Sequence, residues 1–312
     1  MAARSLIIPV YRNEENIPDL LVAVRELASQ APGKFEAVFV VDGSPDRCFA
    51  LLSAALPSAG FAARLILLSR NFGSFTAIRA GLVAAHGDHF AIMTADLQEP
   101  PALVAEMFTA LDSGACDVVV GSRASRADPF FSRIFSALFW ATYRRFVEPS
   151  LPQGGVDVFG CNAAFRDVLL KMDEAHSSLV GLIYWMGFRR TEISYARALR
   201  RQGHSAWSFR RKLSYLSDSI FSFTDLPVRI LLASGVIGMT LSIGLGFLAL
   251  VSRLLNWITV PGYTATILVL LFFGGTIQLG LGIVGSYVWR AYENTKRRPA
   301  FIVTREVFFS PP

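Results

Sequence analysis

Cysteine and histidine are scarce in this sequence, which has three cysteines and four histidines among 312 residues. Cys48, Cys116 and Cys161 lie far apart and lack the paired spacing of a zinc site or a disulfide framework, so we expect reduced thiols. No combination of Ser, His and Asp residues suggests an activated nucleophile. Chemistry that depends on a strong general base is therefore not indicated.

Glycine-rich phosphate loops are also missing. No GxGxxG or Walker pattern follows a predicted strand, which argues against a dinucleotide-dependent enzyme and against a P-loop ATPase. Met1 leads directly into a predicted strand, so we expect no signal peptide. The formal net charge of +6 suits an anionic membrane surface and anionic substrates, although a solvated basic surface would give the same value. We expect no nucleic-acid partner.

Charged residues are missing from two stretches near the carboxyl terminus. None occurs from Ile230 to Val251, and none occurs from Leu254 to Trp289. Each stretch exceeds the roughly 20 residues needed to cross a bilayer, so we predict two transmembrane helices at about 230–251 and 265–288. Two helices buried in a large core are the alternative.

Basic residues flank both stretches, while the loop between them holds only Arg253. Those before the first stretch are Arg210, Arg211, Lys212 and Arg229, and those after the second are Arg290, Lys296, Arg297, Arg298 and Arg305. This asymmetry predicts a multi-pass protein of the inner (plasma) membrane whose large domain is cytoplasmic. Glycine-rich helix faces, such as that of Gly274 and Gly275, favour packing between subunits, so we expect a homo-oligomer.

Strand-like and helix-like segments alternate before these stretches. The expected strands cover Ser5–Tyr11, Phe35–Val41, Arg64–Leu68, His89–Thr94 and Val118–Gly121, and the expected helices cover Ile17–Ser29, Ser74–Ala85 and Ala102–Phe108. This order predicts βαβ units and hence an α/β fold with a mostly parallel sheet. We divide the chain into a sheet domain (1–208), an interfacial helix (209–226), a transmembrane pair (227–290) and a cytoplasmic tail (291–312).

The strongest chemical signal is a strand-to-helix loop, Thr94-Ala95-Asp96-Leu97-Gln98-Glu99-Pro100-Pro101. Asp96 and Gln98 follow a buried strand, at the sheet edge where open α/β sheets bind ligands. Their side-chain oxygens suit Mg²⁺ or Mn²⁺, which is commonly shared with substrate phosphates. An Asp at this place is as readily a helix cap or a turn residue. Asp42 lies at the end of the second strand and could bind a base or ribose. Its alternative role is likewise that of a helix cap.

Four motifs occur in one order along the chain. They are Pro9-Val10-Tyr11-Arg12-Asn13-Glu14-Glu15, Val41-Asp42-Gly43-Ser44, Leu68-Ser69-Arg70-Asn71-Phe72-Gly73 and Ala95-Asp96-Leu97-Gln98-Glu99-Pro100-Pro101. With the membrane pair they resemble the family 2 glycosyltransferases, in particular the polyprenyl-phosphate (dolichol-phosphate mannose synthase-like) group. The resemblance covers nearly the whole chain. It implies a GT-A (Rossmann-like) fold and an inverting transfer from a UDP- or GDP-linked nucleotide sugar to the phosphate of a membrane polyprenol, such as undecaprenyl phosphate.

The resemblance also implies roles for individual positions. The residues that would bind the donor are Pro9, Tyr11, Glu14, Asp42, Arg70, Thr94 and Ala95. Asp96 and Gln98 would hold the metal on the donor diphosphate, with Asp96 at the catalytic centre. Arg123 would meet the acceptor phosphate, and Arg201 lies in a basic segment that would close over both phosphates.

The chain departs from the family pattern at three places. Val41 and Thr94 stand where the family usually has aspartate, and Gly160-Cys161-Asn162-Ala163 replaces a usual Gly-Asp-Phe-Arg. These departures motivate one alternative, a catalytically altered subunit that binds nucleotide sugars or acts as a scaffold. Another alternative is a glycan synthase of the same family, whose Gln-x-x-Arg-Trp motif is only partly matched by residues 202–207.

Two amphipathic segments are candidates for the bilayer surface. Residues 130–146 are rich in aromatics with interspersed arginines, and residues 212–223 carry apolar side chains at helical spacing. Both patterns suit helices lying in a membrane interface, and both equally suit a stripe that faces a protein core. The basic residues between 200 and 212 likewise suit either substrate phosphates or anionic headgroups.

Overall fold

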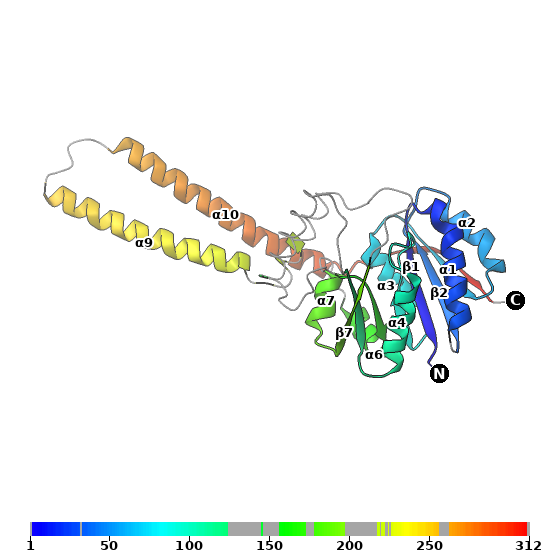
Figure 1. Ribbon diagram of the computed structural model, residues 1–312. Helices are drawn as coiled ribbons and strands as arrows, with labels where there is room; N and C mark the ends of the chain where they lie inside the picture. Colours follow the sequence, from blue (N-terminus) through cyan, green and yellow to red (C-terminus); the bar gives the residue numbers. More distant parts are fainter. Residues whose placement is uncertain are drawn as a thin grey trace.

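The computed structural model describes residues 2–31, 33–123, 145, 156–172, 178–196, 217–218, 220–221, 224, 226–255 and 262–310. Within these ranges a sheet flanked by helices is followed by two long helices that extend away from it (Figure 1). The predicted segments 130–146 and 209–226 fall almost entirely outside the described residues, and so does Arg201.

Eight strands form one sheet in the order β7-β5-β6-β4-β1-β2-β3-β8. The strands are β1 (Arg4–Val10), β2 (Phe35–Val41), β3 (Ala62–Leu68), β4 (His89–Ile92), β5 (Val118–Arg123), β6 (Val156–Asn162), β7 (Arg190–Tyr195) and β8 (Val303–Phe309). Four neighbouring pairs are parallel and three are antiparallel, because β6 and β8 run against their neighbours. The α/β prediction is confirmed, with a sheet more mixed than predicted.

Helices cover both faces of the sheet. They are α1 (Ile17–Gln30), α2 (Cys48–Ala55), α3 (Ser74–Ala84), α4 (Pro101–Asp112), α6 (Ala163–Lys171) and α7 (Leu179–Trp185), with 3-10 turns η1 (Glu14–Asn16) and η2 (Leu56–Ser58). Side chains of a strand alternate between faces. Ile7 accordingly packs in the cluster that includes α3, whereas Leu6 and Ile8 pack in the cluster that includes α1 and α2. This two-sided burial explains why β1 and β2 are almost uninterrupted apolar runs.

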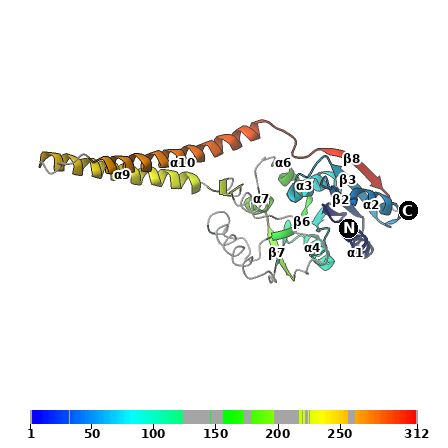
Figure 2. The ribbon, with the colours of Figure 1, turned by 90° about the horizontal axis from the view of Figure 1, so that it is seen from above.

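The carboxyl-terminal segment adds a strand that the sequence did not indicate. Residues 303–309 lie in the predicted tail, and they pair antiparallel with β3 as the edge strand β8. Arg64 on β3 forms an ion pair with Glu306 on β8, with 3.1 Å between Nη1 and Oε1. The chain therefore returns from the long helices to the sheet, which Figure 2 shows from above.

The two long helices are α9 (Leu226–Leu254) and α10 (Tyr263–Thr295). They contain the predicted membrane spans, and at about 1.5 Å per residue each exceeds roughly 40 Å in length. They lie side by side, since a Cβ atom on Gly238 of α9 would stand 3.2 Å from the ring of Phe273 on α10. Judged by length and hydropathy together, none of the helices in the described part of the chain qualifies as a membrane span.

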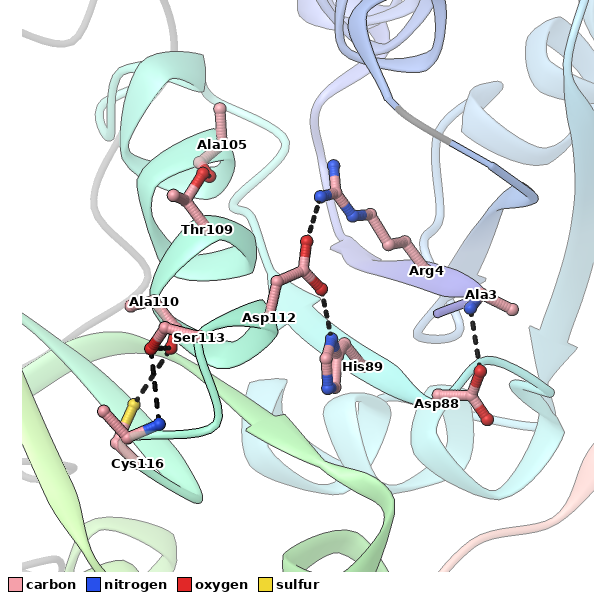
Figure 3. Close-up of polar contacts among 11 residues, drawn as sticks. Ala3, Arg4, Asp88, His89, Ala105, Thr109, Ala110, Asp112, Ser113 and Cys116 are labelled. Atoms are coloured by element: carbon pink, nitrogen blue, oxygen red, sulfur yellow. Dashed lines mark hydrogen bonds and ion pairs between the residues drawn. The ribbon is translucent and has the colours of Figure 1, made fainter. Parts of the chain in front are cut away.

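A polar cluster ties the start of β1 to the start of β4 and the end of α4 (Figure 3). Asp112 pairs with Arg4 through Oδ2, and its Oδ1 lies 2.8 Å from Nδ1 of His89. The Arg4 side chain is only 9% exposed, and its guanidinium also lies 5.2 Å from the ring centre of Phe108. Burial raises the pKa of Asp112, but the hydrogen bonds from Arg4 and His89 outweigh it and hold that pKa below its ordinary value.

We predict that Asp112→Asn lowers the free energy of unfolding at pH 7 by about 1–3 kcal/mol, because asparagine leaves the nearly buried Arg4 without a countercharge. The unfolded pKa is about 3.9 and the folded pKa is lower, so the contribution is complete above roughly pH 4 and is lost as the pH falls through the folded value. Urea unfolding of the full-length protein in mild detergent should show the two proteins converging in acid. Asp167→Asn, at an exposed ion pair on α6, is the control and should change little. A pH-independent difference for Asp112→Asn would contradict the assignment.

Candidate functional site

The order of the strands reverses between β1 and β4. From β1 the chain builds β2 and β3 toward one side, and β4 then pairs with β1 on the other side. The chain leaves β1 toward β2 and leaves β4 toward β5, which lie on opposite sides of this pair of strands. In open α/β sheets such a reversal, at the carboxyl ends of the strands, is where ligands bind.

Every described candidate from the sequence lies at this carboxyl edge. Pro9 and Tyr11 are at the end of β1, Glu14 begins η1, Asp42 follows β2, Arg70 follows β3, the segment from Thr94 to Gln98 follows β4, and Arg123 ends β5. Across the sheet, the Arg123 position is separated from the Asp96 loop by β6, and Arg70 lies two strands beyond β1. The edge thus places Asp96 centrally, with Asp42 and Arg70 on one side and Arg123 on the other.

The loop after β4 turns sharply around Asp96. Leu97 has a φ of +51°, in the left-handed region that bulky residues rarely adopt. Its N–H donates to the Thr94 carbonyl over 3.3 Å, and its side chain packs against the core on the α1 and α2 side of the sheet. The reversal brings the backbone N–H of Gln98 to 3.5 Å from Oδ1 of Asp96. Strained backbone of this kind is concentrated at functional sites.

A hydroxyl holds the same oxygen of Asp96 from the other side. Oγ1 of Thr94 lies 2.7 Å from Oδ1 of Asp96, and it also contacts Oε2 of Glu99. Glu99 is 1% exposed, and the Tyr195 hydroxyl donates to its Oε1 over 3.4 Å. Neither Glu99 nor Tyr195 was predicted from the sequence to have a role of its own. A carboxylate placed directly before Pro100 was the available signal for Glu99, whereas Tyr195 comes from β7 and no local pattern pointed to it.

Asp42 connects the loop after β2 to the loop after β3. It is 2% exposed, its Oδ1 accepts from the Phe72 N–H and its Oδ2 accepts from the Gly73 N–H, both over 2.8 Å. Gly73 is the N-cap residue of α3, which begins at Ser74. Asp42 therefore ties down the approach to a neighbouring helix rather than capping the helix that follows it in sequence.

Gly43 permits the close approach of these two loops. Its φ is +55°, and a Cβ atom there would lie 2.2–2.6 Å from backbone atoms of Arg70 and Asn71. A side chain at this position is excluded both by the left-handed conformation and by contact with the neighbouring backbone. Arg70 itself is exposed, with its guanidinium carbon 4.1 Å from the ring centre of Phe72. The loop that carries Arg70 is thus held against the loop that carries Asp42 and Gly43.

The loop after β1 is braced by the loop after β2. Arg12 has a φ of +54°, and its N–H donates to the Ser44 hydroxyl over 2.8 Å. That hydroxyl donates to Asp46 over 2.6 Å, while Glu14 accepts from the backbone N–H of Arg47 over 3.0 Å. Glu14, to which the resemblance gives a role in donor binding, therefore contacts the loop after β2.

All three cysteines are free and buried. Cys48 begins α2, beside the braced loops, and its thiol donates to Asp46 over 3.2 Å. Burial and the neighbouring Asp46 carboxylate raise the pKa of Cys48 to about 12. Burial likewise raises the pKa of Cys161. Both thiols stay protonated at neutral pH and are poor nucleophiles.

The segment compared with the family's acceptor motif lies elsewhere. Residues 160–162 end β6, which runs antiparallel to β4, and Asn162 pairs with His89 at the start of β4. This is the edge opposite Asp96. The comparison of Gly160-Cys161-Asn162-Ala163 with an acceptor site is therefore wrong, because the direction of β6 carries its end away from the ligand edge.

The donor set of the Asp96 loop suits a shared cation. Among the described residues no group of three or more His, Cys, Asp and Glu side chains is arranged to hold a metal ion. Asp96 and Gln98 supply two oxygen-bearing side chains, whereas Mg²⁺ takes about six ligands and often keeps waters and substrate phosphates among them. The residues present thus fit a cation that arrives with a phosphate ligand.

The sequence matches the family model described as Glycosyl transferase family 2 over residues 5–172. It is similar to the putative glycosyltransferase CsbB of Bacillus subtilis, with 32% identity over 96% of this chain and 90% of that protein. A prophage bactoprenol glucosyl transferase homolog of Escherichia coli is 28% identical over 96% of this chain and 98% of its own length. The undecaprenyl-phosphate 4-deoxy-4-formamido-L-arabinose transferase of Klebsiella pneumoniae is 28% identical over 97% of this chain and 93% of its own length.

Among solved structures, the mannosyl-3-phosphoglycerate synthase of Rubrobacter xylanophilus matches 70% of this chain and 72% of its own, with 13% identity and a TM-score of 0.49. A likeness of this degree supports no inference about the activity or the ligand of this chain.

We predict that Gly43→Ala costs about 1–3 kcal/mol more in free energy of unfolding than Gly60→Ala, and that it weakens UDP binding. Both glycines have positive φ, but nothing lies within 4 Å of a Cβ atom built on Gly60, so the control carries the conformational strain alone. Urea unfolding and calorimetric titration with UDP measure the two effects. Equal values for the two variants would show that the contact with the Arg70 backbone is unimportant.

Proposed function

Because this chain belongs to glycosyl transferase family 2, we propose that it transfers a sugar from a nucleotide sugar to the phosphate of a membrane polyprenol. That it is a glycosyltransferase follows from its family and its relatives. Relatives named for bactoprenol and for undecaprenyl phosphate support a polyprenyl phosphate as the acceptor, and undecaprenyl phosphate is our first candidate. The observation that carries the proposal is the placement of Asp96 and Gln98 on the loop after β4, at the carboxyl edge of the sheet where the strand order reverses.

We assign the donor to the side of the edge formed by the loops after β1, β2 and β3. Asp42 and Gly43 fix the backbone of residues 70–73, and Ser44 fixes Arg12, so this side is preorganised. Pro9, Tyr11 and Arg70 border the same space. A rigid pocket of this kind suits the base and ribose of a UDP- or GDP-linked sugar.

The transfer requires stabilisation of the negative charge on two phosphate groups more than it requires removal of a proton. An acceptor phosphate is already an anionic nucleophile, and a single in-line displacement of the diphosphate would invert the sugar. Asp96 and Gln98 would hold Mg²⁺ or Mn²⁺, which supplies positive charge to the leaving diphosphate. Arg123, at the end of β5, would bind the acceptor phosphate as a bidentate donor. Arg201, which lies outside the described residues, would close the site from above as the resemblance implies.

We further propose that α9 and α10 cross the inner membrane as a hairpin, with the sheet domain on the cytoplasmic side. The charge-free stretches lie in these helices, and most of the large apolar side chains exposed in the described part of the chain lie there too. Trp289 and Tyr292 are exposed near the end of α10, and Nζ of Lys296 lies 4.4 Å from the ring centre of Tyr292. Aromatic and basic residues together are typical of a membrane–water interface.

A homo-oligomer is part of the same proposal. Within the described residues, nothing lies within 4 Å of a Cβ atom built on Gly274, Gly275, Gly282 or Gly285 of α10. Small residues at such spacing let a second helix approach closely.

We predict that purified protein with Mg²⁺ or Mn²⁺ and undecaprenyl phosphate makes a lipid-phosphate sugar from one member of a panel of UDP- and GDP-sugars. Asp96→Ala should reduce the product, measured by mass spectrometry, by at least about a thousandfold, because the charge that holds the cation is lost. Asp167→Ala removes an exposed carboxylate on α6 and should retain full activity. Unchanged turnover in Asp96→Ala would refute the proposed site. Nucleotide binding without any product would favour a binding or scaffold role.

We predict that single cysteines placed at the two ends of α10 label from opposite sides of the membrane. Gly262→Cys should react with a membrane-impermeant maleimide in intact cells, whereas Thr295→Cys should react only after the membrane is opened. The three native thiols are buried and provide a low background. Reaction of both positions from outside, or release of the protein by alkaline carbonate, would contradict the hairpin.

A further inference from the structure

The Thr94 hydroxyl stands between two carboxylates in the loop that carries Asp96. Its Oγ1 lies 2.7 Å from Oδ1 of Asp96 and is hydrogen-bonded to Oε2 of Glu99. Thr94 is half-buried, Asp96 is half-buried and Glu99 is 1% exposed. The three side chains thus form one short chain of contacts that runs from the interior to the ligand edge.

The buried end of this chain is anchored by a different part of the sheet. Tyr195 is the last residue of β7 and is 5% exposed, and its hydroxyl donates to Oε1 of Glu99 over 3.4 Å. In the register of β5 and β7, Tyr195 pairs with Arg123. The contacts therefore link the end of β7, which lies beside Arg123, to the loop that carries Asp96.

A hydroxyl has one proton, so Thr94 donates to only one of its two carboxylate neighbours at a time. Donation to Asp96 fixes the carboxylate through Oδ1, and the long contact from the Gln98 N–H falls on that same oxygen. A carboxylate held by a second group in this way loses less side-chain freedom when it binds a cation, and such supporting contacts raise metal affinity.

We propose that Thr94 is a positioning residue whose hydroxyl orients Asp96 for the cation, while the buried Glu99, itself held by Tyr195, competes for the same hydroxyl proton. This inference rests on the proposed function, because it assumes that Asp96 holds the cation. It also gives Thr94 a role different from that of the aspartate usual in the family. An aspartate at 94 would place a third carboxylate in contact with those of Asp96 and Glu99, whereas a threonine places a neutral donor there.

The arrangement makes Thr94 and Glu99 interdependent. Thr94→Asp alone brings like charges together and is expected to weaken the site. Adding Glu99→Gln removes one of these charges while keeping the shape of the side chain, so the double variant should recover much of the loss. Residues in direct contact show such coupling, whereas independent sites give additive effects.

The test compares Thr94→Val with Thr94→Ser in the full-length protein in mild detergent. Valine keeps the shape of threonine without the hydroxyl, and serine keeps the hydroxyl. The affinity for Mn²⁺ in the presence of UDP is measured from the electron paramagnetic resonance signal of unbound Mn²⁺. We expect about a tenfold weakening for Thr94→Val and a change within about twofold for Thr94→Ser, since a hydrogen bond to a charged group is lost only in the former.

Kinetics separate positioning from general damage. The Mn²⁺ concentration for half-maximal transfer should rise with Thr94→Val, while kcat at saturating Mn²⁺ stays within about threefold of the wild type. If Thr94→Val fails to fold, Glu99→Gln alone decides the matter. Its amide donates to Oγ1 of Thr94 and leaves the hydroxyl proton for Asp96, so Mn²⁺ affinity should be kept within about twofold. Equal Mn²⁺ affinities for Thr94→Val and wild type, or a tenfold loss in Glu99→Gln, would overturn the inference.

Asp96→Ala distinguishes the two levels of the proposal. If it abolishes Mn²⁺ binding and transfer while Thr94→Val binds like the wild type, the role of Thr94 is wrong and the proposed function stands. If Asp96→Ala binds Mn²⁺ and transfers sugar like the wild type, the proposed function fails, and the role of Thr94 fails with it.

Discussion

The reversal of strand order at β1 and β4 is the constraint on which the rest of the site depends. Because β4 joins the sheet on the opposite side of β1 from β2, the strand order reverses at this pair of strands. The strands that precede the candidate residues run in one direction, so these residues share one edge of the sheet. Among the described residues, the connections after β1, β2, β3 and β4 that carry them are short.

Buried polar contacts give those short loops fixed positions. On the side proposed for the donor, both oxygens of Asp42 accept backbone N–H groups, and Gly43 lets the neighbouring backbone pass at close range. On the side proposed for the acceptor, Glu99 joins Thr94 to Tyr195. Buried carboxylates are costly unless they are hydrogen-bonded, so each one fixes its partners as firmly as it is fixed itself.

The path of the carboxyl-terminal segment connects this site to the long helices. The chain leaves the sheet domain after β7, forms α9 and α10, and returns to the sheet as β8 beside β3 (Figure 2). Arg290 of α10 pairs with Asp218 over 2.8 Å, and Tyr287 packs edge-on against Phe221. These contacts join the last turns of α10 to the residues just before α9, at the end of the helix pair nearest the sheet (Figure 1).

From the sequence alone, the five strands and three of the four α-helices of the first 123 residues could be predicted, together with the four motifs at their ends, whereas α2 (Cys48–Ala55) was missed. Apolar runs such as Phe35–Val41 are strong signals because both faces of the sheet are buried, and that strand was predicted with the bounds that it has. The two long helices could also be located, because charge is absent over more than 20 consecutive residues in each. Asp42 and Asp96 were each predicted at the carboxyl end of a strand, whereas Arg123 was singled out only through the resemblance to the family.

Only the tertiary structure decided the partners of these residues. That Asp42 binds the backbone before α3, that Glu99 meets Tyr195 and that residues 160–162 lie at the opposite edge all depend on contacts between segments 30 to 100 residues apart or on the direction of β6. Strand β8 was missed for the same reason, since its partner β3 lies about 240 residues earlier. Local patterns report burial and periodicity, whereas pairing across such distances is set by how the whole sheet closes its edges.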